Sequence, residues 1–200
     1  RFPFLKKVGD WNRFNKNTGG TLVEKCCHFF DLMCIAANSE PRQVFASGSQ
    51  SVNHLDESYG GLTPDILDNA FVVVDFENGV RAHLDLCMFA EASKNEQEIC
   101  VVGDLGKVEA LVSESTIRVG LRTQGVGSFD EFAVSGASPY AGFHHGASYE
   151  EHVRLHESIR LRRKPEVSLR DGLRSVAIGV AAQISIADNR VVSISEVMGI

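Results

Sequence analysis

Two β-rich segments on either side of Asn78-Gly79 constrain the fold of this chain most strongly. Residues 70–76 read Ala-Phe-Val-Val-Val-Asp-Phe, and along residues 80–86 apolar side chains alternate with polar ones. Asn-Gly favours the positive φ angles of a two-residue turn whose twist matches the flanking strands. The pattern therefore predicts an antiparallel hairpin with one buried face and one polar face.

The patterns around this hairpin predict an α+β domain. Apolar residues recur at spacings of four and three along residues 20–37, which indicates a helix. Two more helices, at about 148–162 and about 168–188, close the chain. Further strands are expected at 44–52, 98–102, 108–112, 116–121, 132–134 and 191–194. This order predicts one large, predominantly antiparallel sheet that helices cover on one face.

Composition excludes several classes of function. The formal net charge is −6 and no basic stripe carries aromatic residues, which argues against nucleic acid as the main partner. No apolar run reaches the ~18 residues that span a bilayer. The number of cysteines, five, is odd, and no two of them are spaced as CxxC, so we do not expect a disulfide framework. A reducing, cytoplasmic compartment is the better interpretation.

Three ionisable side chains recur along the first predicted helix. Glu24, His28 and Asp31 stand at i, i+4 and i+7, which on a continuous helix places them within about 60° of one face. Charge on an otherwise apolar helix is costly unless it has a role. Histidine exchanges protons near neutral pH, so His28 is a candidate general base or acid. The alternative is a structural core histidine, with Asp31 as a structural helix carboxylate.

Other side chains are candidate substrate contacts. Lys25 projects about 100° away from Glu24 on a helix and could reach a cofactor cleft. The polar and aromatic residues 10–15 include Arg13, suited to a phosphate or carboxylate, and Asn15. This segment faces a substrate or cofactor, or it packs a domain junction. His144 and His145, in a glycine-rich loop, either line a sugar pocket or are ordinary loop residues.

An ordered set of motifs resembles one known family. Gly19-Gly20 is followed by a carboxylate, by histidine four residues later and by aspartate three beyond that. The set continues with Asp68-Asn69-Ala70-Phe71, Asn78-Gly79, Gly103-Asp104-Leu105-Gly106-Lys107 and Val167-Ser168-Leu169-Arg170-Asp171-Gly172. Together these resemble the C-terminal α+β domain of the glucose-fructose oxidoreductase / inositol dehydrogenase (Gfo/Idh/MocA) family, a fold of the dihydrodipicolinate-reductase-like type.

The resemblance implies that residues 1–200 are the substrate-binding and oligomerisation domain of a longer, two-domain NAD(P)-dependent oxidoreductase. The substrate would be a sugar, a cyclitol or a related polyol, whose secondary alcohol and ketone interconvert. His28 matches the catalytic histidine of the family, and Glu24 stands where the family more often has aspartate. NAD or NADP would be bound mainly by a Rossmann domain, for which this sequence has no G-x-G-x-x-G.

The same resemblance implies that this chain by itself is inactive. A sheet with helices on one face leaves a broad surface to cover, so we expect a homodimer or homotetramer through that open face. Two alternatives stay open. One is a non-catalytic dimerisation or ligand-sensing module of the same fold. The other is a small metal-dependent enzyme centred on His145, His152 and His156, the last two of which have helical ligand spacing.

Overall fold

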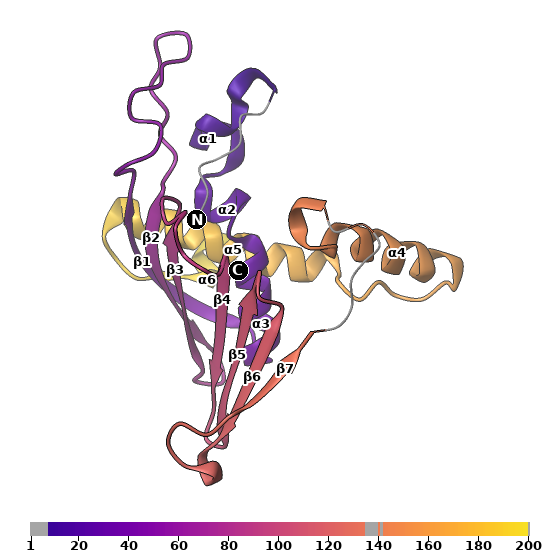
Figure 1. Cartoon of the computed structure of the whole chain (residues 1–200). Helices are drawn as coiled ribbons and strands as arrows, with labels where there is room; N and C mark the ends of the chain where they lie inside the picture. Colours follow the sequence, from indigo (N-terminus) through magenta and orange to yellow (C-terminus); the bar gives the residue numbers. More distant parts are fainter. Residues whose placement is uncertain (1–7, 135–139, 141, 200) are drawn as a thin grey trace. The chain divides into compact units, whose positions relative to one another are not determined.

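The computed structural model describes residues 8–134, 140 and 142–199. The chain divides into two compact units, Arg1–Glu91 with Leu169–Ile200 and Ala92–Ser168. Each unit has its own four-stranded antiparallel sheet (Figure 1).

The first unit is built on a four-stranded sheet in the order β3-β2-β1-β8. Its strands are β1 (Pro41–Ser49), β2 (Asn69–Phe76), β3 (Arg81–Cys87) and β8 (Val192–Ser193). The predicted hairpin is confirmed, because β2 pairs with β3 in antiparallel register from Asn69↔Cys87 to Asp75↔Arg81. Gly79 supplies a φ of 85° in the turn.

Helices cover the inner face of this sheet. The longest, α5 (Leu169–Asp188), lays Ala177, Ile178, Ala181 and Ala182 against it, and all four are buried. The side chains of β1 and β2 that point to this face are also buried in the same core. The remaining helices of the unit are η1 (Val8–Arg13), α1 (Asn15–Thr18), α2 (Thr21–Glu24), α3 (Cys27–Ala37) and α6 (Ile194–Met198).

The helix predicted over residues 20–37 is interrupted. It forms as α2 and α3, with Lys25 and Cys26 as turn residues between them. Leu22, Cys26 and Phe30 all remain fully buried across the break. Cysteine, histidine and phenylalanine have lower helix propensity than alanine or leucine. The segment Cys26-Cys27-His28-Phe29-Phe30 therefore favours a continuous helix only weakly, and tertiary packing determines the backbone conformation there.

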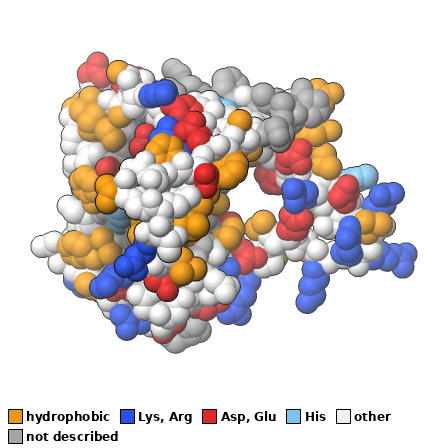
Figure 2. Space-filling view, turned by 60° about the horizontal axis from the view of Figure 1, so that its bottom comes forward, with side chains coloured by type: hydrophobic (Ala, Val, Ile, Leu, Met, Phe, Trp, Pro, Cys, Tyr) orange, Lys and Arg blue, Asp and Glu red, His pale blue; other side chains and the backbone are white. Residues whose placement is uncertain are grey.

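The second unit contains the other four-stranded sheet, in the order β4-β5-β6-β7. Its strands are β4 (Gln97–Val102), β5 (Gly106–Val112), β6 (Thr116–Leu121) and β7 (Asp130–Ala133). The short helices η2 (Arg122–Gln124) and η3 (Gly142–His144) and the longer α4 (Ala147–Arg160) complete it. No α4 residue is buried among those described, and Figure 2 shows charged side chains of both signs over α4 and the residues that follow it, at the right of the view.

The α+β class with antiparallel pairing is thus confirmed, but the prediction of one large sheet is wrong. In the described part of the chain, no ladder joins β3 to β4. The backbone N–H of Met88 donates to the carbonyl of Asp68, which continues the β2–β3 register by one pair, and the Met88 carbonyl accepts from the Asn53 side chain. No described helix is both long enough and apolar enough to cross a membrane.

Candidate functional site

The structure places Glu24 and His28 on opposite sides of the break between α2 and α3. Glu24 is the last residue of α2, and its side chain is 15% exposed. His28 lies in the first turn of α3 and is exposed, whereas Asp31, one turn later, is half-buried. A ligand can therefore reach the imidazole of His28, which is not enclosed by the apolar core.

The break changes the geometry expected from a continuous helix. In the described residues, His28 hydrogen-bonds to neither Glu24 nor Asp31, and its Nδ1 lies 4.0 Å from the Sγ of Cys27. The Nζ of Lys25 lies 3.7 Å from the Oε1 of Glu24, so the lysine is directed to the neighbouring carboxylate. Glu24 and Lys25 thus form a pair at the end of α2, and the exposed imidazole of His28 follows three residues later, beyond the break.

Cys27, which neighbours His28, is not activated as a nucleophile. Burial raises the pKa of the Cys27 thiol, and hydrogen bonding only partly offsets this. A cysteine nucleophile needs a lowered pKa, because the thiolate is the reactive form. Cys27 therefore lacks the lowered pKa that a cysteine nucleophile requires.

Arg13 occupies a different environment from the one expected for a substrate contact. It is 3% exposed, and its Nε donates to the Oε2 of Glu57 over 2.9 Å. The guanidinium is therefore already committed to a carboxylate from the loop between β1 and β2. Arg13 joins this loop to the segment that leads into α1.

Glu57 is the centre of a polar cluster that the sequence analysis did not identify. Its carboxylate accepts hydrogen bonds from Arg13, from the Nδ1 of His54 at 2.8 Å and from the hydroxyl of Tyr59 at 2.8 Å. Burial alone would raise the pKa of Glu57, but these hydrogen bonds outweigh it and lower the pKa to about 2. A density of polar side chains in residues 53–59 was the available signal, although 44 residues separate Arg13 from Glu57.

Asn15 is held by the far end of the same loop. Its backbone N–H donates to the Oδ1 of Asp65, and its side-chain amide donates to the Asp65 carbonyl, both at 2.7 Å. Asp68 then fixes the start of the loop by accepting N–H groups from Ser51, Val52 and Asn53. Arg13 and Asn15 therefore share a framework role, positioning the chain ahead of α2.

The cluster predicts a pH-dependent contribution to stability. A carboxyl whose pKa is lowered on folding stabilises the folded state above its unfolded pKa of about 4.3, and this contribution is lost as pH falls through the folded value. Because the folded pKa of Glu57 is about 2, its contribution to stability is lost as the pH falls from about 4.3 to about 2. We expect the Glu57→Gln variant to have a lower free energy of unfolding than the wild type at pH 7. Below pH 4 this difference between variant and wild type should become smaller.

Urea unfolding between pH 7 and pH 3 measures this effect. Glu77→Gln is the matched control, since Glu77 is an exposed glutamate whose side chain makes none of these contacts. A Glu57→Gln deficit that stays constant over the whole range would contradict the assignment.

His144 and His145 belong to the second unit. Both are exposed, and the Nε2 of His145 lies 3.2 Å from the Oε2 of Glu96. His152 also has a local partner, because its Nδ1 lies 2.6 Å from the carbonyl of Ser148. Among the described residues, no group of three or more His, Cys, Asp or Glu side chains is arranged to hold a metal ion. The metal-dependent alternative therefore has no geometric support in this part of the chain.

Comparisons with known proteins agree in the family that they indicate. A sequence model of the oxidoreductase family, C-terminal alpha/beta domain, matches residues 1–194. The chain is 29% identical over 187 residues to myo-inositol 2-dehydrogenase of Thermotoga maritima, covering 91% of this chain and 51% of that protein. It is 30% identical over 182 residues to the uncharacterized oxidoreductase YrbE of Bacillus subtilis, covering 90% and 49%. The chain thus spans about half the length of the curated relatives it matches.

Solved structures share the fold. Levoglucosan dehydrogenase, in complex with NADH and levoglucosan, superimposes with a TM-score of 0.74 at 18% identity, over 92% of this chain and 53% of that one. An oxidoreductase domain protein from Kribbella flavida gives a TM-score of 0.72 at 18% identity, over 90% and 53%.

Proposed function

Because this chain belongs to the Gfo/Idh/MocA oxidoreductase family, as its C-terminal alpha/beta domain, we propose that it supplies the substrate site of a polyol dehydrogenase. The substrate class is a sugar, a cyclitol or a related polyol, and the reaction interconverts a secondary alcohol and a ketone. The observation that carries this proposal is the exposed imidazole of His28, four residues after the partly buried carboxylate of Glu24 across the α2–α3 break. The names of two relatives, an inositol dehydrogenase and a levoglucosan dehydrogenase, support the substrate class.

The proposed role of this chain is to bind the polyol and move a proton. Oxidation of an alcohol releases the hydroxyl proton, and a neutral imidazole accepts it near physiological pH. His28 is the general base in that direction and the general acid in the reverse direction. Glu24 accepts a hydrogen bond from a substrate hydroxyl or from the imidazole, and Asp31 and Lys25 bind the outer hydroxyls. His144 and His145 remain candidate substrate contacts.

The described residues do not fit a dinucleotide on their own. All strand pairings among them are antiparallel, whereas the dinucleotide fold requires parallel strands joined through a helix. We therefore place NAD or NADP on another part of the polypeptide and expect this 200-residue chain to be inactive alone. Calorimetry of the isolated chain with NADH tests this, and micromolar binding would overturn it.

The function itself is tested by turnover. We expect the full-length protein to reduce NAD or NADP only when a polyol is present, followed as the absorbance of the reduced nicotinamide. A panel of myo-inositol, levoglucosan and an acyclic alcohol of similar size separates polyol recognition from general alcohol oxidation. If none of these compounds supports reduction of either cofactor, the proposed function is wrong.

We also propose a homodimer or homotetramer through the outer face of the first sheet. Phe45, Phe71 and Val73 are 41%, 64% and 41% exposed there. The register sets Phe45 opposite Val73, which makes the patch continuous across β1 and β2. We expect Phe71→Glu to lower the mass measured by light scattering at tens of micromolar, whereas Val80→Glu in the hairpin turn should not. A wild-type monomer at that concentration would contradict this assembly.

A further inference from the structure

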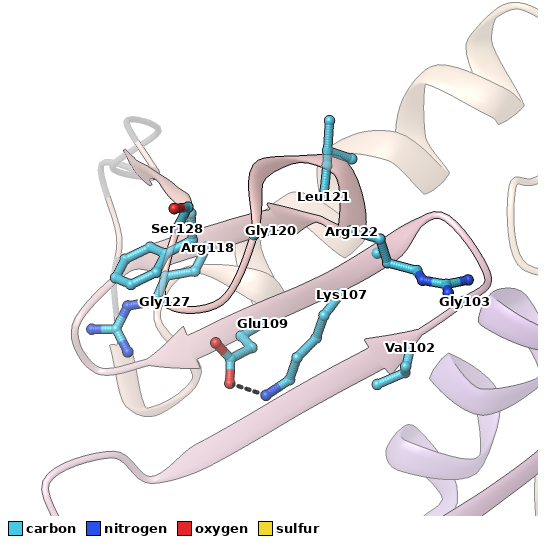
Figure 3. A pocket seen from close by; sticks show the side chains of 13 residues that line it. Val102, Gly103, Lys107, Glu109, Arg118, Gly120, Leu121, Arg122, Gly127 and Ser128 are labelled. Carbon is cyan, nitrogen blue, oxygen red and sulfur yellow. Dashed lines mark hydrogen bonds and ion pairs between the residues drawn. The ribbon is translucent and has the colours of Figure 1, made fainter.

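The second unit contains a hollow of about 500 Å³ that the proposed function does not use. It lies over β4, β5 and β6, and the segment that follows β6 arches above it (Figure 3). Pockets for small ligands are typically about 300–1,000 Å³, so this one has room for a monosaccharide-sized molecule.

Glycines form much of the lining of this hollow, which includes Gly103, Gly106, Gly120, Gly125 and Gly127. Two of them also allow the backbone to pack closely beside it. A Cβ on Gly106 would lie 2.2 Å from the carbonyl oxygen of Gly120 on the neighbouring strand, and a Cβ on Gly120 would lie 3.3 Å from the carbonyl oxygen of Ser128. The floor of the hollow is thus partly backbone, which lets a ligand approach closely.

Three cations and one carboxylate line the hollow. Figure 3 shows Lys107 and Glu109 beside each other on the strands, with Arg118 toward one end and Arg122 toward the other. The Nζ of Lys107 lies 2.7 Å from the Oε1 of Glu109, and the Nε of Arg118 donates to Glu131 over 2.8 Å. Glu109 and Glu131 thus balance the charges of Lys107 and Arg118.

Arg122 is the cation that remains uncompensated. Its Nη1 donates to the backbone carbonyl of Asp104 over 2.9 Å, and no carboxylate pairs with it in the described part of the chain. One hydrogen bond orients the guanidinium and leaves its other donors for a ligand. A guanidinium binds carboxylate and phosphate groups best, through two parallel hydrogen bonds.

The rest of the lining suits a hydroxylated molecule. The ring of Phe129 is 54% exposed, and the guanidinium carbon of Arg118 lies 5.7 Å from its centroid. The Lys107–Glu109 pair offers both a donor and an acceptor for hydroxyl groups. An apolar ring face next to a few polar groups is the usual composition of a small-molecule pocket.

We infer that this hollow binds a small polyhydroxylated anion, whose carboxylate or phosphate group is held by Arg122. The glycine floor and Phe129 contact its carbon skeleton, and Lys107 and Glu109 bind its hydroxyls. This site is independent of His28, so either assignment can fail without the other.

Calorimetric titration of the full-length protein tests the inference with three probes: gluconate, glucose 6-phosphate and glucose. We expect the anions to bind at least about tenfold more tightly than glucose, because a charged hydrogen bond contributes roughly that factor or more. Tighter binding of gluconate would identify the carboxylate as the preferred group, and tighter binding of glucose 6-phosphate would identify the phosphate. Binding should weaken as salt is added, since the hollow is open to solvent.

Arg122→Gln should weaken binding of the preferred anion by at least about tenfold. Arg42→Gln, at an exposed arginine on β1, is the matched control and should leave the affinity unchanged. His28→Asn should also leave it unchanged, which separates this site from the catalytic one. Equal binding of glucose, an unaffected Arg122→Gln variant, loss of binding in His28→Asn, or no binding of any probe at millimolar concentration would each overturn the inference.

Discussion

Exchanging His28 for asparagine in the full-length protein is expected to lower kcat for polyol oxidation by about 10²–10⁴-fold. Asparagine keeps the side chain polar and of similar reach, but it cannot accept the hydroxyl proton. His28 is exposed, so the exchange leaves the packing of the core unchanged. The free energy of unfolding should therefore stay within about 0.5 kcal/mol of the wild type.

The control for this exchange is His156→Asn. His156 lies on α4 and is exposed like His28, but it lies outside the α2–α3 site. We expect wild-type turnover from His156→Asn and the loss of kcat from His28→Asn alone. If His28→Asn retains full turnover, His28 does not perform the chemistry. If the wild type also shows no polyol-dependent turnover, the ligand-sensing or dimerisation module becomes the better interpretation.

Local patterns predicted most of the secondary structure. Strand alternation and the Asn78-Gly79 turn identified the β2–β3 hairpin, and β6 begins and ends at the predicted residues 116 and 121. The errors arose where tertiary contacts decide the outcome. The helix break at Lys25 and Cys26 lies where α2 and α3 pack against α5, and the division of the strands into two sheets follows from pairing between distant parts of the chain.

The candidate site shows the same contrast between features set by local sequence and features set by tertiary contacts. The spacing of Glu24 and His28 was visible in the sequence because both residues follow one short motif. The Glu57 cluster was not, because its hydrogen bonds join Arg13 to a loop that only the folded chain brings near it. His54 has a φ of 63°, which is uncommon for residues other than glycine even though histidine is among those that adopt it more often, so the sequence did not indicate it. Chemistry within one element can be predicted from sequence, whereas the framework that positions it depends on long-range contacts.

One such long-range contact fixes the position of α2. Gly179, in α5, lies so close to α2 that a Cβ added to it would be 2.6 Å from the carbonyl oxygen of Leu22 and 3.1 Å from the Cα of Val23. Both of these atoms belong to the backbone, so no side-chain rotation can relieve the overlap. Glu24 follows immediately, so the distance between α5 and α2 also determines where its carboxylate stands.

Gly179→Ala is therefore expected to push α2 away from α5 and to lower stability and turnover together. Overpacking of this kind costs about 1–3 kcal/mol, of which the higher helix propensity of alanine returns up to about 1 kcal/mol. We expect a net loss of up to about 2 kcal/mol in the free energy of unfolding, measured with urea.

Gly172→Ala in the same helix is the control, because a Cβ there has no neighbour within 4 Å. This variant gains helix propensity without overlap and should be more stable than the wild type by up to about 1 kcal/mol, with unchanged turnover. The two alanines thus differ in the sign of their effect. If both stabilise the protein equally, α5 does not set the position of α2, and the placement of Glu24 must depend on other contacts.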